Sequence, residues 1–136
     1  MELSQFLGLP YFFTGHTREG LDCWGLIRLY YREKHKKELP PYSKVYQQYS
    51  LKSSLHDFTK DPDVPEFVLN LIPAFKKQID DIIVLRVYHQ SIHCGLYVKK
   101  DTMLHIDIDS DSHLVEIYPG SFWYNRIETY WRPRWI

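Results

Sequence analysis

The chain has 136 residues, of which 44% are hydrophobic and 25% charged, the proportions of an ordinary globular protein. Its 17 basic residues balance 17 acidic ones, so no net charge attracts nucleic acid or an anionic membrane surface. The N-terminus lacks the basic and apolar segments of a signal peptide, and no apolar stretch is long enough to span a membrane. We therefore expect one domain over residues 1–136, made in the cytoplasm, with no nucleic-acid partner and no membrane insertion.

A loop and then a helix are predicted in the first third of the chain. Glycines and a proline mark turns between residues 7 and 21. Asp22 has the position and chemistry of a helix N-cap, and apolar residues recur after it at three- and four-residue spacing. This pattern predicts a helix over residues 23–32, which Pro40 and Pro41 prevent from continuing further.

The second half of the chain has the pattern of strands. Before them, the weakly patterned segment 42–79 predicts only a short helix over about residues 64–72, with Pro65 in its first turn. The predicted strands cover residues 81–87, 91–98, 103–107, 114–118 and 126–131, with turns at 99–102 and 109–112. A helix followed by an antiparallel meander predicts the α+β class.

Cys23 is the first candidate for chemistry, because it directly follows the predicted N-cap. In the first turn of a helix, free backbone N–H groups and the helix dipole favour negative charge. That position lowers the pKa of a thiol and enriches the thiolate, which is the attacking species. The same N–H groups can receive an oxyanion. For Cys23 taken alone, a small buried side chain without chemistry is the alternative.

Two of the seven histidines have the placement of a general base and its partner. His93 and His105 lie in predicted strands on either side of one hairpin turn, so both imidazoles can share a face of the sheet. One imidazole can then contact Cys23 while the second orients the first. For either histidine alone, a core residue satisfied by backbone carbonyls is the alternative. Most of the seven histidines are expected to be solvated surface groups.

The second cysteine, Cys94, follows His93 directly. Because neighbours in a strand alternate between faces, Cys94 is expected to be buried packing and not a second nucleophile. A metal site built from Cys23, His93, Cys94 and His105 is the rival chemistry. No Cys-X-X-Cys or His-Glu-X-X-His spacing supports it, so we expect neither metal nor cofactor.

Five short segments together resemble the NlpC family of papain-like cell-wall cysteine peptidases. They read PYFFTG at 10–15, LDCWGL at 21–26, DDIIVL at 80–85, HCGLYV at 93–98 and MLH at 103–105. The resemblance spans about residues 7–106. It implies a helix bearing the nucleophile Cys23 packed on a central antiparallel sheet, with His93 as base and His105 as the orienting third member. It also implies hydrolysis of amide bonds in peptidoglycan stem peptides.

The resemblance further implies residues that contact the substrate. Tyr11 matches a tyrosine that lines the site and hydrogen-bonds near the thiol. Asp22 matches a residue that holds the free amine of the stem peptide in some members, although it is also a sufficient N-cap without that role. Trp24 replaces the family's serine and could fill a substrate pocket. The paired glycines of the family appear here as Thr-Gly at 14–15, and its Gly-Asp appears as Asp-Asp at 80–81.

A finer resemblance rests on Trp24 and on LIRLYYRE at residues 26–33, which are similar to tail-assembly proteins of long-tailed bacteriophages. It implies tail-tip proteins as partners, incorporation in the virion tail and action on the periplasmic cell wall. A non-catalytic assembly subunit of the tail tip is the alternative, and deamidation or transacylation also stays open. The C-terminal YWRPRWI at 130–136 suits a protein interface or a last strand that closes the sheet.

Overall fold

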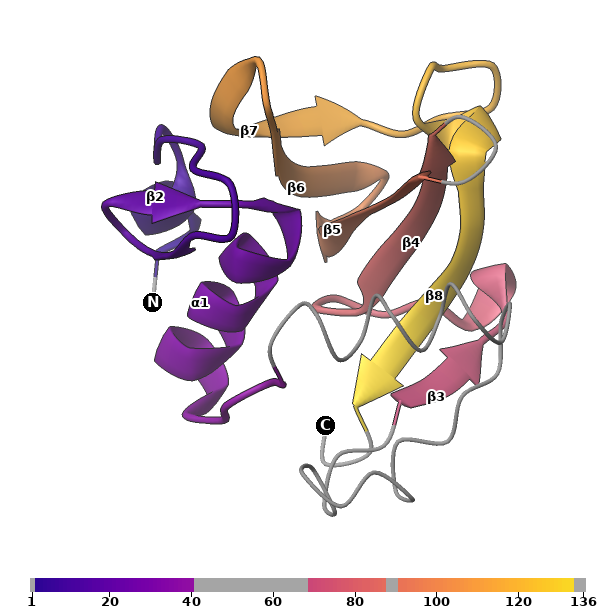
Figure 1. The fold of residues 1–136 in the computed structure, drawn as a ribbon. Helices are drawn as coiled ribbons and strands as arrows, with labels where there is room; N and C mark the ends of the chain where they lie inside the picture. Colours follow the sequence, from indigo (N-terminus) through magenta and orange to yellow (C-terminus); the bar gives the residue numbers. More distant parts are fainter. Residues whose placement is uncertain (1, 41–68, 88–90, 134–136) are drawn as a thin grey trace.

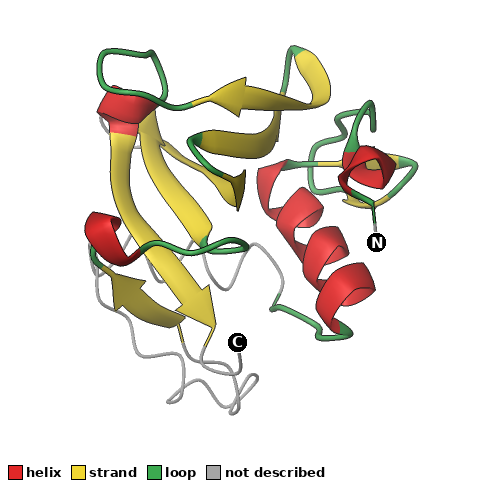
Figure 2. Ribbon diagram, turned by 180° about the vertical axis from the view of Figure 1, so that it is seen from behind, coloured by secondary structure: helices red, strands yellow, loops and turns green. Residues whose placement is uncertain are grey.

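The computed structural model describes residues 2–40, 69–87 and 91–133, and it packs an α-helix against a six-stranded antiparallel sheet (Figures 1 and 2). The helix α1 spans Cys23–His35. The strands are β1 His16–Thr17, β2 Gly20–Leu21, β3 Leu69–Ile72, β4 Ile82–Val87, β5 Ser91–Lys99, β6 Thr102–Asp107, β7 Ser110–Glu116 and β8 Ile127–Pro133. Short 3-10 helices cover Leu3–Phe6, Ala74–Lys76 and Tyr124–Arg126. In this part of the chain no helix has the length and apolar character needed to cross a membrane.

The large sheet has the strand order β3-β8-β4-β5-β6-β7, with every pair antiparallel. Strands β4 to β7 form a meander, and β8 then returns to insert between β3 and β4. The predicted α+β class is therefore confirmed. Because β5 and β6 are neighbours, the strands that carry His93 and His105 lie side by side.

Three predicted elements differ from the structure. The helix continues to His35 and ends where Lys36 adopts a left-handed conformation, with its N–H donating to the carbonyl of Tyr31. The helix predicted over residues 64–72 is wrong at residues 69–72, which form β3 because β8 satisfies their backbone groups; residues 64–68 lie outside the described residues. The turn predicted at 109–112 is shorter, since β7 already begins at Ser110.

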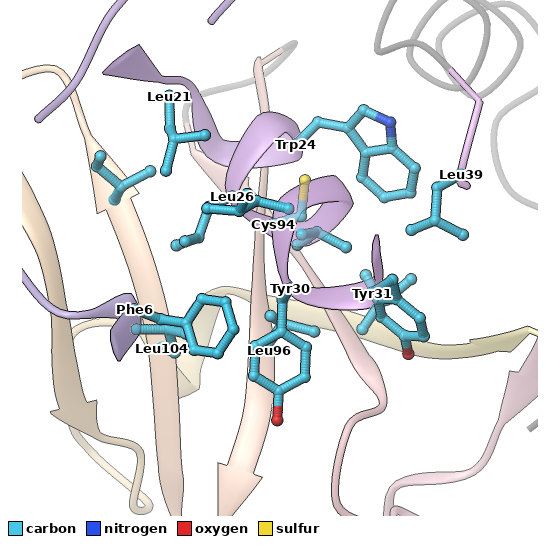
Figure 3. Close-up of a cluster of buried hydrophobic side chains, with 14 of the residues drawn as sticks. Phe6, Leu21, Trp24, Leu26, Tyr30, Tyr31, Leu39, Cys94, Leu96 and Leu104 are labelled. Atoms are coloured by element: carbon cyan, nitrogen blue, oxygen red, sulfur yellow. The ribbon is translucent and has the colours of Figure 1, made fainter. Parts of the chain in front are cut away.

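The main hydrophobic core lies between α1 and the sheet (Figure 3). Helix residues such as Trp24, Leu26 and Tyr31 are almost fully buried against the strand residues Leu96 and Leu104. A second, smaller cluster covers the opposite face of the sheet, and its members include Ile83, Leu85, Tyr97, Met103 and Tyr130. Burying a large apolar side chain stabilises the fold by about 1.5 to 3 kcal/mol, so this two-sided burial fixes the position of the central strands.

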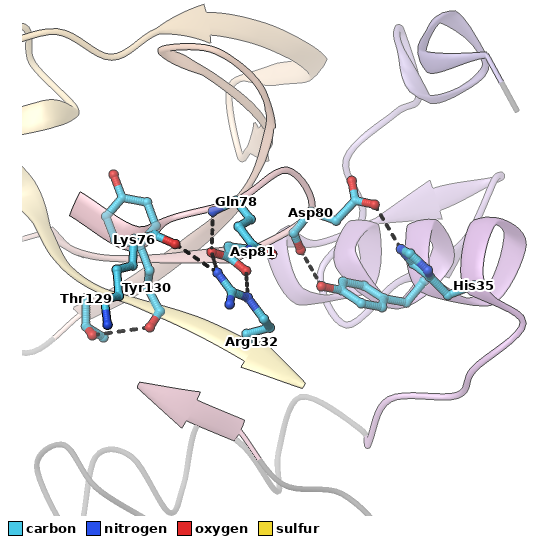
Figure 4. A network of polar contacts seen from close by, with 9 residues as sticks. His35, Lys76, Gln78, Asp80, Asp81, Thr129, Tyr130 and Arg132 are labelled. Carbon is cyan, nitrogen blue, oxygen red and sulfur yellow. Dashed lines mark hydrogen bonds and ion pairs between the residues drawn. The ribbon is translucent and has the colours of Figure 1, made fainter. Parts of the chain in front are cut away.

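Two adjacent carboxylates tie the helix and the last strand to the start of β4 (Figure 4). Asp80 accepts a hydrogen bond from the Tyr30 hydroxyl at 2.5 Å and contacts His35 Nε2 at 2.9 Å, both on α1. Asp81 binds Arg132 of β8 through both oxygens, at 2.7 and 2.8 Å. The Asp-Asp pair at 80–81 therefore connects the start of β4 to two other elements. Asp80 binds side chains of α1, and Asp81 binds a side chain of β8.

Glycine is required at position 25 by a close approach of the backbone. A Cβ atom placed there would lie 1.9 Å from the carbonyl oxygen of Gly15. The N–H of Asp22 donates to that same oxygen at 3.1 Å. The loop before the helix is thus held against the first turn of α1, which fixes the start of the helix relative to the loop.

We predict that Gly25→Ala destabilises the protein by at least about 2 kcal/mol, because the added methyl group overlaps the Gly15 carbonyl. Alanine otherwise stabilises a helix interior by about 1 kcal/mol relative to glycine. Urea unfolding measures the change in the free energy of unfolding. A loss shows that the overlap with the Gly15 carbonyl dominates, and a gain shows that helix propensity dominates. A variant as stable as the wild type, or more stable, would contradict the contact.

Candidate active site

Cys23 is the first residue of α1 and is partly exposed. The Asp22 side chain caps the helix, since its Oδ1 accepts a hydrogen bond from the N–H of Gly25 at 2.6 Å. The first intrahelical bond runs from the N–H of Leu26 to the carbonyl of Asp22 at 3.0 Å. The amides of Cys23 and Trp24 precede that bond, so they are placed to interact with an anion at the Cys23 sulfur.

The second cysteine contacts the first. Cys94, on β5, is buried in the main core beneath the first turn of α1 (Figure 3), and its Sγ lies 3.7 Å from Sγ of Cys23. The hydrogen bond from the Cys94 thiol holds the pKa of Cys23 well below its usual value, and hydrogen bonding and charge from His93 act in the same direction. The same contact, together with burial, raises the pKa of Cys94, so the two sulfurs are shifted in opposite directions.

The two predicted histidines contact each other. Nε2 of His93 lies 2.9 Å from Nδ1 of His105, and both side chains are buried. Since His93 uses Nε2 for this contact, its Nδ1 remains for the thiol of Cys23. The three side chains predicted to act as nucleophile, base and orienting residue are thus brought together from α1, β5 and β6.

His105 is held in its neutral form. Burial lowers its pKa to about 3, and the neighbouring charges of His93 and His113 lower it further. Its Nε2 is buried and has no hydrogen-bond partner in the part of the chain that the structure describes. A neutral His105 can accept a hydrogen bond from the Nε2–H of His93 through its Nδ1, and this bond orients the His93 ring.

Two aromatic residues that sequence reasoning missed complete the surroundings of the histidines. The Trp123 ring lies over His93, with centroids 4.9 Å apart and planes 30° from parallel, and 5.0 Å from His105. His113, directly opposite His105 on β7, stacks on it at 4.4 Å. His113 is partly buried against His105, unlike a solvated surface histidine.

Some of these neighbours left a signal in the sequence and some did not. The tight β6–β7 hairpin pairs His105 with His113, so locating its turn correctly would have identified His113. Cys94 was correctly expected to be buried, but its contact with Cys23 depends on how the helix docks on the sheet. Trp123 lies in a connection just before a 3-10 helix and carries no periodic pattern.

The predicted substrate contacts occupy three different environments. Tyr11 is partly buried beside the site, and its pKa is raised by burial and then by the charges of Asp22 and Cys23. Asp22 is 8% exposed and serves as N-cap. Trp24 is 1% exposed, and its indole N–H donates to the carbonyl of Pro40 at 2.7 Å. The side chain of Trp24 therefore lies in the core and offers no free surface to a substrate.

A family model described as "NlpC/P60 family" matches residues 8–132 of this chain. The chain belongs to the NlpC/P60 family. The helix–sheet arrangement around Cys23 is that of an NlpC/P60 fold.

Within the described residues, no group of three or more His, Cys, Asp or Glu side chains is placed to hold a metal ion.

Several solved structures share the NlpC/P60 fold. The NlpC/p60 domain of the peptidoglycan hydrolase SagA aligns with a TM-score of 0.60 and 13% identity, over 93% of this chain and 89% of that one. An NlpC/P60 family protein from Bacillus cereus ATCC 10987 aligns with a TM-score of 0.65 and 20% identity, over 95% of this chain and 37% of that one. A protein described as similar to lipoprotein, NLP/P60 family, from Staphylococcus aureus subsp. aureus Mu50 aligns with a TM-score of 0.65 and 19% identity. The alignment covers 94% of this chain and 37% of that one.

The chain therefore spans only about a third of the length of two of these neighbours. No curated protein sequence matches it. At these identities the likeness to the neighbours shows a common fold, and the chemistry of this NlpC/P60 protein has to be argued from its own side chains.

We predict that iodoacetamide modifies Cys23 well before Cys94 near neutral pH, because Cys23 is partly exposed and its pKa is lowered, whereas Cys94 is buried and its pKa is raised. Peptide mapping of the alkylated protein measures both rates. In Cys94→Ala the pH midpoint of Cys23 labelling should rise, because the hydrogen bond from the Cys94 thiol is lost. Cys94→Ser, which keeps a donor, is the matched control. Equal or inverted labelling of the two cysteines would count against this assignment.

The capping carboxylate gives a second prediction. Burial raises the pKa of Asp22 from 3.8 to about 6, against the opposing hydrogen bond from Gly25. The folded protein therefore binds more protons than the unfolded chain between these values, so Asp22 contributes less stability as pH rises through this window. Asp22→Asn keeps a capping oxygen but does not titrate.

Relative to Asp22→Asn, the wild type should lose roughly 2 kcal/mol of unfolding free energy between about pH 4 and pH 7. Urea unfolding of both proteins at a series of pH values measures this difference. A difference that does not change with pH would show that Asp22 titrates normally.

Proposed function

We propose that this protein is a cysteine hydrolase that cleaves amide bonds in the stem peptides of peptidoglycan. The observation that carries the proposal is the contact set of Cys23, His93 and His105 at the start of α1. A helix N-terminus, a lowered thiol pKa and a paired imidazole are the requirements for nucleophilic acyl transfer, and all three meet at one sulfur.

The chemistry follows from these positions. The Cys23 thiolate attacks the carbonyl carbon of the scissile amide, and the negative oxygen that forms is received by amides of the first turn of α1. His93, which holds the proton from the thiol, donates it to the leaving nitrogen as the C–N bond breaks. Water, deprotonated by His93, then attacks the thioester and restores the thiol. His105 keeps the His93 ring in orientation through both steps.

Peptidoglycan as the substrate is supported by family membership and by the named activity of one neighbour, the peptidoglycan hydrolase SagA. Two residues of this chain suit a stem peptide. The Asp22 carboxylate lies beside Cys23 and can attract the free amine of such a peptide when ionised, and the Tyr11 phenol lies within electrostatic range of both. Asp22 has this role in addition to its role as N-cap.

The setting we propose is the tail tip of a long-tailed bacteriophage, where the protein, made in the host cytoplasm and incorporated in the virion, acts on the periplasmic wall. This part rests on the resemblance of Trp24 and residues 26–33 to tail-assembly proteins. Exposed aromatic side chains suit contacts with tail-tip proteins, since Phe12, Phe13 and Phe75 are 65%, 76% and 82% exposed. A structural tail subunit that keeps the fold without hydrolysis is the second candidate, supported by the same exposed residues.

We predict that the purified protein releases new free amines from peptidoglycan and that Cys23→Ala abolishes the release, because the neighbouring thiol of Cys94 is buried and its pKa is raised. Mass spectrometry of the muropeptides identifies the bond that is cut. His93→Ala should lower the rate to nearly that of Cys23→Ala, since a thiol without its base is a poor nucleophile.

Activity that survives in Cys23→Ala would overturn the hydrolase mechanism. A folded but inactive wild type that binds tail proteins would favour the assembly subunit. Phe75→Ser, in the 3-10 helix Ala74–Lys76 and 82% exposed, is the matched control, because it should reduce binding to a tail partner without changing hydrolysis.

A further inference from the structure

The two cysteines of the chain lie in contact, although they are separated by 71 residues. Cys23 begins α1, and Cys94 lies on β5 beneath it. Their sulfurs are 3.7 Å apart, whereas a disulfide holds its sulfurs about 2.05 Å apart. The sulfurs therefore need to approach each other by about 1.7 Å to form a bond, and the Cys23 sulfur already lies against the backbone N–H of Cys94.

We propose that Cys94 is a resolving cysteine, which forms a reversible disulfide with Cys23 when a peroxide oxidises the nucleophile. The hydrolysis mechanism gives Cys94 no covalent step, so this assigns a modification site beyond the proposed function. The disulfide removes the attacking thiolate and protects it from irreversible oxidation. A thiol reductant then returns both side chains to their active state.

The environments of the two sulfurs suit the two different roles. Cys23 is partly exposed, so a small peroxide reaches it, and the hydrogen bond from Cys94 lowers its pKa. Cys94 is 6% exposed, and its own pKa is raised by the hydrogen bond to Cys23 and by burial. An oxidant in solution therefore oxidises Cys23 first, and Cys94 is placed to react only with the oxidised Cys23 sulfur.

The reaction balances in two steps. The Cys23 thiolate attacks one oxygen of hydrogen peroxide and breaks the O–O bond, which gives a sulfenic acid and, after proton uptake, one water. The Cys94 sulfur then attacks Cys23 Sγ, forms the S–S bond and displaces the sulfenic oxygen, which leaves as a second water with the Cys94 proton. Two thiols are oxidised to a disulfide and one peroxide is reduced to two waters.

The sequence makes the product unambiguous, because the chain has two cysteines in all. An intramolecular loss of two hydrogens from the intact mass can therefore come only from a bond between Cys23 and Cys94. Such a bond would also link the start of α1 to the centre of the sheet across a long loop. It should raise the thermal unfolding temperature, since it restricts the unfolded chain.

The test treats reduced wild-type protein with hydrogen peroxide and follows it by non-reducing intact mass and peptide mapping. We expect a monomer that has lost two hydrogens, with a cross-linked peptide pair that dithiothreitol separates. Cys94→Ser replaces the thiol by a hydroxyl group of similar size and is the matched variant. It should gain oxygen atoms at Cys23 that dithiothreitol does not remove, because a sulfinic acid is not reduced by thiols.

A wild type that gains the same oxygens as Cys94→Ser, or that forms only disulfide-linked dimers, would overturn the proposal. If Cys94→Ser fails to fold, the wild-type mass and cross-linked peptide still decide the question. An activity measurement adds a second readout that rests on the proposed function. Amine release from peptidoglycan should stop on oxidation and return with dithiothreitol in the wild type alone. The intact mass and the thermal unfolding temperature are measured without a substrate. They therefore distinguish failure of the redox step from failure of the hydrolase assignment.

Discussion

The docking of the first turn of α1 on the loop before it and on β5 is the constraint on which the site depends. The Asp22 cap fixes where the helix begins, and the absence of a side chain at Gly25 lets the Gly15 carbonyl approach the first turn. The core beneath the helix and the bonds from Asp80 to Tyr30 and His35 hold the other end. If the helix began one residue later, the Cys23 side chain would lose its contacts with both Cys94 and His93.

The electrostatics of the site follow from that docking. The Asp22 carboxylate, the thiol and the imidazoles lie close together in a largely buried region, where charge is costly unless it is paired. The structure limits the cost by lowering the pKa of the Cys23 thiol through its hydrogen bonds, and by shifting the pKa values of His105 and Cys94 in the directions that keep them neutral. Trp123 covers the two imidazoles and limits the access of water to their hydrogen bond.

Local signals in the sequence were sufficient for much of this arrangement. The N-cap at Asp22, the helix after it and the central strands could be read from spacing and residue type, because those signals act within a few residues. The placement of His93 and His105 on neighbouring strands also followed from one short hairpin. Strand β3 could not be predicted, since its four residues are extended only because β8 pairs with them. The contacts of Cys94 with Cys23 and of Trp123 with the histidines join segments far apart in the chain, and nothing local encodes them.

Trp24 shows how a departure from a family pattern can act through packing. Its position directly after Cys23, the proposed nucleophile, suggests a side chain that shapes the substrate pocket. Its indole is instead buried in the core and bonded to the carbonyl of Pro40, so it ties the start of α1 to the segment that follows the helix. This bond holds the segment after the helix against the first turn of α1, which presents Cys23. On the proposed function, selectivity for a substrate then has to come from side chains that a peptide can reach, such as those of the loop of residues 10–16.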